Sequence, residues 1–144
     1  MPIVLDDSAW PILHHTVGEH SREHFDAFGD WYLACLRRAR ADNVRLYVVS
    51  DARGGIPDPD TRRRAAQWLA GLSEPQFDVC ALSIIVVDNP LIRGVITALN
   101  WFRRPSTPQQ IVDSVEQGWQ LIVDDHVRRA LPVPPRPLWV STST

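Results

Sequence analysis

The feature that most constrains this chain is an apolar run near its middle, residues 79–87 (VCALSIIVV), which has the length of a β-strand. Because apolar and polar residues do not alternate in it, a strand formed here must be covered on both faces. Such a strand is typical of the centre of a parallel sheet. We therefore expect Ser83 to be buried with its hydroxyl bonded, and Ile84→Asp to unfold the domain.

Strand-like and helix-like segments alternate on both sides of this run. Further strands are predicted at residues 3–5, 10–17, 44–50 and 110–112, and Pro11 makes the second of them edge-like because proline cannot donate to a ladder. Helices are predicted at about 21–41, 58–71, 90–102 and 114–129 from apolar residues at helical spacing. The predicted fold is α/β, a mixed, largely parallel sheet flanked by four helices in β-β-α-β-α-β-α-β-α order.

The length of 144 residues suits one domain with one core, which we assign to residues 1–131. The remaining segment, residues 132–144 (PVPPRPLWVSTST), is predicted to be a polyproline-like tail that cannot be helical. We expect this tail to contribute little to the core, so that truncation before Pro132 leaves the fold intact. Leu138 and Trp139 are nevertheless apolar enough to dock on this or a neighbouring molecule.

Composition excludes several classes of protein. With 44% hydrophobic residues and a formal net charge of −2, the chain is neither disordered nor an evident nucleic-acid binder. No apolar stretch approaches the roughly 20 residues of a membrane span, and no basic segment leads into an apolar run at the N-terminus. Cys35 and Cys80 lie in apolar patterns, which indicates inert, reduced thiols. We expect a cytoplasmic protein without a cofactor.

Three features together resemble a known family. They are Asp51-Ala52-Arg53-Gly54 at a strand end, Arg93-Gly94-Val95 followed by Trp101, and an amphipathic stretch around Trp119. With the element order, they resemble the STAS domain, the anti-sigma-factor antagonist fold, over roughly residues 3–130. The resemblance implies a non-enzymatic protein-interaction module with a regulatory role. Antagonists of that family carry a phosphorylatable serine after the third strand, where this chain has Ala52 and Arg53, so a simple phosphorylation switch is not expected.

The helix predicted at residues 90–102 carries the candidate interaction surface. Its apolar residues share one arc, and Trp101 falls at the edge of the polar arc, above Gly94. Tryptophan and arginine are enriched at binding hot spots. We predict a protein contact, most simply a two-fold homodimer, at Arg93, Gly94, Thr97, Trp101 and Arg104. The alternative is that Trp101 lies flat against its own chain.

A second candidate is the loop formed by Asp51, Arg53, Gly54 and Gly55, which follows a predicted parallel strand. Ligands of open α/β sheets bind at this end of the strands, so the loop is a candidate site for a small molecule or an anion. The alternative is structural, with an Asp51–Arg53 or Asp51–Arg62 ion pair that fixes the loop.

A third candidate is a metal-dependent hydrolase, because residues 20–24 (HSREH) match the H-x-x-E-H zinc motif. His20 and His24 would bind the metal, and Glu23 would act as base. Ser21 is the better helix cap, however, which leaves His20 outside the helix, and we predict no metal site. His14 and His15 point to opposite faces of a strand, so they cannot easily share a metal; we expect one to point outward and one to be partly buried.

Overall fold

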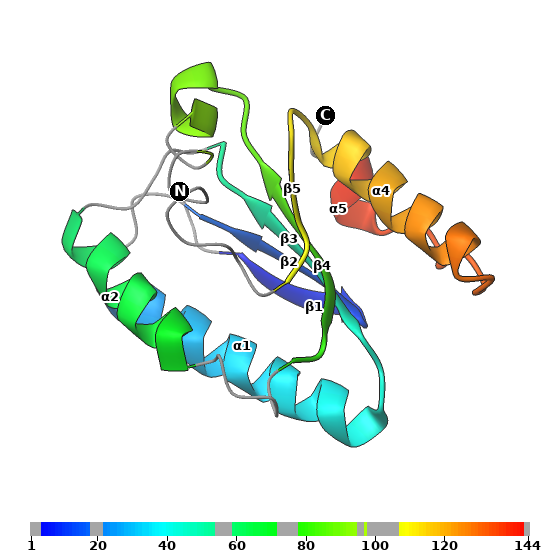
Figure 1. Cartoon of the computed structure of the whole chain (residues 1–144), viewed down its shortest axis with the longest axis horizontal. Coiled ribbons are helices and arrows are strands. Elements are labelled where there is room, and N and C mark those ends of the chain that lie inside the picture. The colour runs from blue at the N-terminus through cyan, green and yellow to red at the C-terminus, as the bar shows by residue number, and fades with distance from the viewer. Residues whose placement is uncertain are drawn as a thin grey trace.

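The computed structural model describes residues 4–17, 22–53, 59–71, 78–94, 97 and 107–142 (Figure 1). The strands are β1 (Leu5–Ala9), β2 (Ile12–Thr16), β3 (Leu46–Asp51), β4 (Cys80–Val86) and β5 (Gln109–Val112). The helices are α1 (Arg22–Asp42), α2 (Pro59–Gly71), α4 (Val115–Arg128) and α5 (Leu138–Thr142), and residues 90–94 and 97 are also helical. The rest of the helix predicted at 90–102 lies outside the described residues. Among the helices described, none is long and apolar enough to cross a membrane.

The five strands form one sheet in the order β1-β2-β3-β4-β5. β1 runs antiparallel to β2, and β2 to β5 are parallel, which confirms a mixed α/β fold with a mostly parallel sheet. The prediction that the second strand is edge-like is wrong, because β2 pairs with β1 and β3. Pro11 lies in the turn before β2 and enters the ladder only through its carbonyl, which accepts from the N–H of Tyr47 at 3.2 Å. The edge strands are β5 and β1, and β1 spans residues 5–9 rather than 3–5.

Helices cover both faces of the sheet: α1 and α2 lie on one side, and α4 and α5 on the other (Figure 1). Successive residues of β2 alternate between the two layers, as the two-residue period of a strand requires. Ile12 packs in the cluster under α4 and α5, and Leu13 in the cluster under α1. The larger cluster, on the α4 side, is composed of Ile12, Tyr47, Val49, Ala81, Ile84, Val86, Val112, Val115, Trp119, Ile122, Trp139 and Val140.

The apolar run forms β4, an inner strand between β3 and β5, but the prediction that it is the central strand is wrong, because β3 occupies that position. Ile84 on β4 is fully buried. The expectation that Ser83 is buried is wrong, because this side chain is only half-buried. Ser83 pairs with Val48 and therefore faces the α1 side of the sheet. The core cluster on that side includes only the first residue of β4, Cys80, so the described helices leave the later positions partly open.

The expectation that residues 132–144 contribute little to the core is also wrong. Residues 131–137 are neither helix nor strand, but Leu138–Thr142 form the helix α5, and Trp139 and Val140 belong to the core. The reason is the width of the sheet. α4 contacts β3, β4 and β5, and the described contacts show α5 packed beside it. Trp139 of α5 stacks on His14 of β2, so α5 adds cover over this strand beside α4.

We expect Trp139→Ala to lower the free energy of unfolding by about 3 kcal/mol, since truncating a core tryptophan removes a large buried surface. Its neighbour supplies the matched control. Leu138 is 85% exposed and Trp139 only 7%, so Leu138→Ala should change stability by less than about 0.5 kcal/mol. Urea denaturation of both variants checks the difference, and equal, small effects would show that α5 is not part of the core.

Candidate functional site

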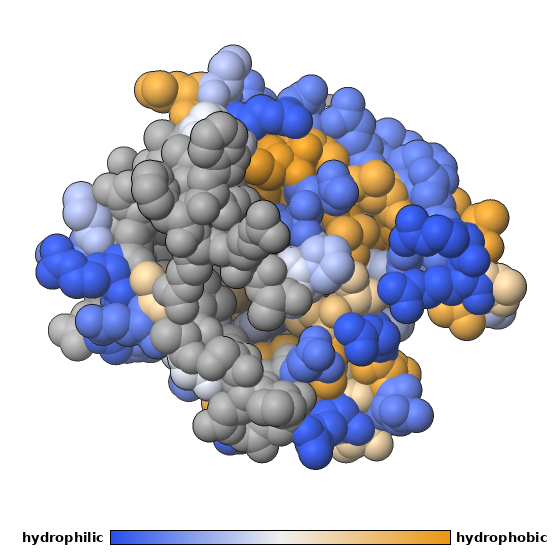
Figure 2. Space-filling model, viewed as in Figure 1, coloured by the Kyte–Doolittle hydropathy of each residue, from blue (hydrophilic) through white to orange (hydrophobic). Residues whose placement is uncertain are grey.

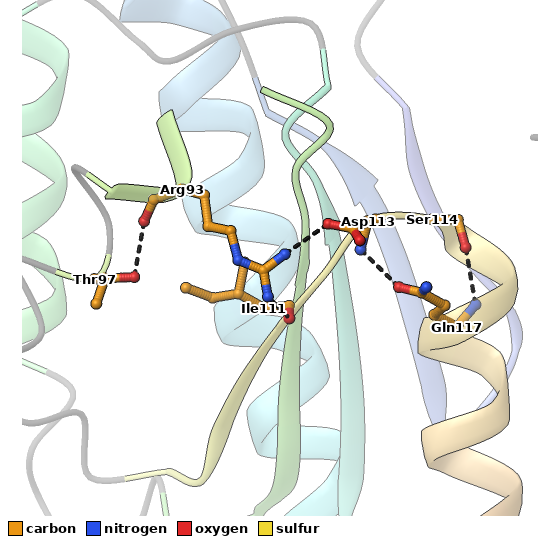
Figure 3. A network of polar contacts seen from close by, with 6 residues as sticks. All are labelled: Arg93, Thr97, Ile111, Asp113, Ser114 and Gln117. Atoms are coloured by element: carbon orange, nitrogen blue, oxygen red, sulfur yellow. Dashed lines mark hydrogen bonds and ion pairs between the residues drawn. The ribbon is translucent and has the colours of Figure 1, made fainter. Parts of the chain in front are cut away.

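The candidate interaction surface is built around Arg93, whose guanidinium reaches the β5–α4 connection (Figure 3). Its Nη1 donates to Oδ1 of Asp113 at 2.6 Å, and its Nη2 donates to the carbonyl oxygen of Ile111 at 3.1 Å. The hydroxyl of Thr97 donates to the carbonyl oxygen of Arg93 at 2.8 Å. The helical turn of residues 90–94 is thus tied to the end of β5.

Asp113 is itself fixed by the start of α4. Ser114 is the N-cap residue, and its hydroxyl accepts from the N–H of Gln117 at 3.1 Å. The side-chain oxygen of Gln117 accepts from the N–H of Asp113 at 2.8 Å, in a variant of the capping box. A serine and a glutamine three residues apart therefore place the carboxylate that receives Arg93.

The predicted surface is only partly among the described residues. Arg93, Gly94 and Thr97 lie on the exposed side of the helical turn, whereas Trp101 and Arg104 lie outside the described residues. A Cβ at Gly94 would meet nothing within 4 Å. Leu91, which belongs to the apolar arc of the predicted helix, is 76% exposed on the same turn. Figure 2 shows hydrophobic surface over this turn, at the upper left of the view.

The second candidate, the loop after β3, contains a bidentate ion pair. Nε and Nη2 of Arg53 donate to the two carboxylate oxygens of Asp51 at 2.9 and 2.7 Å, and the backbone N–H of Arg53 donates to Oδ1 at 3.2 Å. Burial alone would raise the pKa of Asp51, but these bonds outweigh it and hold the pKa below its ordinary value. An anion at this loop would have to compete with Asp51 for the same guanidinium.

Gly54 and Gly55 of this candidate loop lie outside the described residues, and so does the side chain of Arg62, the other proposed partner of Asp51. A ligand-binding role for the loop therefore stays a prediction. What the structure adds is a reason for the local conformation. The ion pair joins the two residues on either side of Ala52. Ala52 itself is buried, and its N–H donates to the carbonyl oxygen of Val86 at 2.9 Å.

The two adjacent histidines of β2 point to opposite faces, as predicted, but the expectation that one points outward is wrong. Both are buried, because helices cover both faces. His15 lies on the α1 side, stacks on Phe28 with ring centroids 4.6 Å apart, and has its Nε2 2.7 Å from the hydroxyl of Ser50. His14 lies on the other side and stacks on Trp139, with ring centroids 4.6 Å apart and an angle of 4° between the planes.

Within the described residues, the structure gathers no further ligands around the zinc motif. Glu23 and His24 lie exposed in the first turn of α1, and His20 is outside the described residues. In the described part of the chain, no group of three or more histidine, cysteine, aspartate or glutamate side chains is arranged to bind a metal.

The two thiols are buried, as predicted, and neither forms a disulfide. Burial raises the pKa of Cys35 to about 11. Burial also raises the pKa of Cys80, whose sulfur lies 3.2 Å from the hydroxyl of Tyr32. Both groups are therefore protonated near neutral pH, and a thiolate nucleophile is not available at either position.

One buried carboxylate was not predicted from the sequence. Asp125 on α4 accepts from the hydroxyl of Tyr47 at 2.5 Å and forms ion pairs with Arg128 and, at 3.0 Å, with Arg129. Burial opposes its charge, but these bonds hold the pKa of Asp125 below its ordinary value. The sequence spacing could have predicted that Asp125 is buried, because Asp125 follows Ile122 by three residues on the buried face of α4.

Comparison with known proteins identifies no relative: no family model matches the chain, and neither a curated protein nor a solved structure is significantly similar to it. The resemblance to STAS domains therefore rests on the sequence features described above.

We expect the Asp51–Arg53 pair to be energetically coupled. A double-mutant cycle with Asp51→Asn and Arg53→Met should give about 1 to 3 kcal/mol of coupling, because the pair is bidentate and mostly shielded from water. The same cycle on the exposed pair Asp60–Arg63 should give about 0.5 kcal/mol or less. Urea unfolding of the parent chain and the six variants provides the measurement.

The coupling should also depend on pH. The folded pKa of Asp51 lies below its ordinary 3.8, so the stabilisation is fully present above the unfolded value and is lost as the pH falls through the folded one. Coupling of equal size in the two pairs, or coupling that survives protonation of Asp51, would contradict this assignment.

Proposed function

We propose that this chain is a non-enzymatic protein-interaction module of the STAS-like type, and that it associates with a second copy of itself through the turn of residues 90–97. We further propose that it acts in the cytoplasm, where its buried cysteines stay reduced. The observation that carries the interaction surface is the exposure of Leu91, which lies two residues before Arg93 on the same helical turn.

Exposure alone does not distinguish this turn, because single apolar residues are common on protein surfaces. What distinguishes this turn is that it also carries Arg93, whose charge is held in place by its own chain. The guanidinium of Arg93 is fixed by Asp113 and by the carbonyl of Ile111, so little side-chain entropy remains to be lost when a partner binds. Arginine is also among the residue types that are enriched at protein interfaces.

The charges favour a second copy of the chain as the partner. Arg93 and Asp113 lie side by side, and their side chains are 44% and 68% exposed. A surface that presents one positive and one negative group in contact is self-complementary under a two-fold rotation, because each charge can face the opposite charge of the other copy. Two copies of Leu91 would be buried in the same contact.

We expect Leu91→Asp to abolish self-association. In a two-fold contact each substitution is made twice, so losing two buried leucines and placing two carboxylates together should raise the dissociation constant at least about a hundredfold. Val127→Asp is the matched control, since Val127 is 63% exposed but lies at the other end of α4. Sedimentation equilibrium at micromolar concentrations gives the masses.

The expected pattern is a dimeric parent chain, a monomeric Leu91→Asp variant and a dimeric Val127→Asp variant. A monomeric parent chain at every concentration tested would overturn self-association. A Leu91→Asp variant that remains dimeric would overturn the assignment of the surface.

A further inference from the structure

The contact between α5 and β2 contains three buried nitrogens without a hydrogen-bond partner. They are Nδ1 and Nε2 of His14 and Nε1 of Trp139, and these are the only such side-chain atoms among the described residues. Buried polar groups in native proteins are nearly always bonded, and each unbonded one opposes burial. All three sit in one stacked pair, which joins the last helix to the sheet.

Two carboxylates near His14, those of Asp6 and Asp51, are hydrogen-bonded to other residues. Asp6 of β1 is its cross-strand neighbour, and Oδ1 of Asp6 accepts from the N–H and the hydroxyl of Ser8 at 2.8 and 2.6 Å. Asp51 of β3 is bound by Arg53. α5 contributes the uncharged ring of Trp139. The charged groups that act on His14 are therefore Asp51, Asp6 and Arg53.

The neutral imidazole of His14 can stay buried under Trp139. Burying the imidazolium there costs much more free energy, because a buried charge needs hydrogen bonds that the stack does not provide. If α5 leaves, water reaches His14, and the two carboxylates then favour its charged form. Burial lowers the pKa of His14 below 6.5 in the closed structure, although Asp51 and Asp6 act in the opposite direction.

We propose that α5 is an acid-releasable cover: protonation of His14 detaches Trp139, and with it the helix Leu138–Thr142, from β2. The sheet itself stays folded, because β2 is hydrogen-bonded to β1 on one side and to β3 on the other. α5 is five residues long, and its two buried anchors among the described side chains are Trp139 and Val140. Segments with few buried contacts open at lower free energy than a sheet.

The direction of the pH effect follows from proton linkage. The released form binds a proton more tightly than the closed form, so the closed form is fully favoured above the released-state pKa. Its advantage is lost as the pH falls toward the lower pKa of the closed state. One proton is involved, so the ratio of closed to released molecules changes by at most roughly tenfold per pH unit. Release uncovers Ile12 and His14 on the α4 side of β2.

Hydrogen exchange followed by mass spectrometry tests this on the whole chain, between pH 7.5 and 5.5 and corrected for intrinsic rates. In the parent chain, protection of the peptide that spans residues 138–142 should fall by up to about tenfold per pH unit, while peptides from β3 and β4 stay protected. His14→Phe keeps an aromatic ring on Trp139 but cannot be protonated, so protection of α5 should no longer depend on pH.

Three further variants sharpen the outcome. His24→Phe, at an exposed histidine on α1, should keep the parent profile. Asp6→Asn removes a carboxylate that raises the pKa of His14, so the profile should move to lower pH. His14→Gln replaces His14→Phe if the phenylalanine variant does not fold.

Protection of α5 that is independent of pH in the parent chain would overturn release, as would an unchanged pH dependence in the non-titrating variant. Loss of protection in β3 and β4 at the same pH would show global unfolding instead.

Discussion

The need to cover both faces of the sheet determines most of this structure. Parallel strands without a polar face must be shielded above and below. α1 and α2 shield one side, and on the other side α4 contacts β3, β4 and β5. Ile12 and His14 of β2 point to the same side as α4 and need cover there as well. The chain solves this by returning through a proline-rich segment and placing Trp139 over β2. The five-residue helix α5 is therefore part of the layer that covers this face of the sheet.

Local patterns were enough to predict the elements that bury themselves through one periodic face. The apolar run became β4, the pattern around Leu36 and Ala39 became α1, and the stretch around Trp119 became α4. The prediction failed where burial depends on a gap left elsewhere. Nothing in the segment LWVST alone indicates a helix, because Trp139 and Val140 are buried by contacts with distant parts of the chain. Pro11 misled for a related reason, since its carbonyl, not its nitrogen, meets the neighbouring strand.

In the candidate sites, too, local sequence did not reveal which charged side chains are paired with distant residues. Sequence identified Arg53 and Arg93 as available cations, and each is bound by a carboxylate of its own chain. The partner of Arg53 is two residues away, so that pair was foreseeable, and it was one of the two alternatives considered. The partner of Arg93 is 20 residues away, across a connection whose geometry depends on the capping of α4 by Ser114 and Gln117. Leu91, which has no such partner, became informative only once its exposure was known.

His14 and His15 show how strand register decides whether a buried histidine is satisfied. The parallel pairing of β2 with β3 sets His15 beside Ser50 and His14 beside Val49. The hydroxyl of Ser50 lies 2.7 Å from Nε2 of His15, whereas valine can offer nothing to His14. Across the other ladder His14 meets Asp6, whose carboxylate is already bound by Ser8. Two histidines adjacent in sequence and equally buried are therefore not equivalent. His15 has a polar partner in Ser50. His14 has none and lies under Trp139, so the proposed release of α5 depends on the protonation of this one histidine.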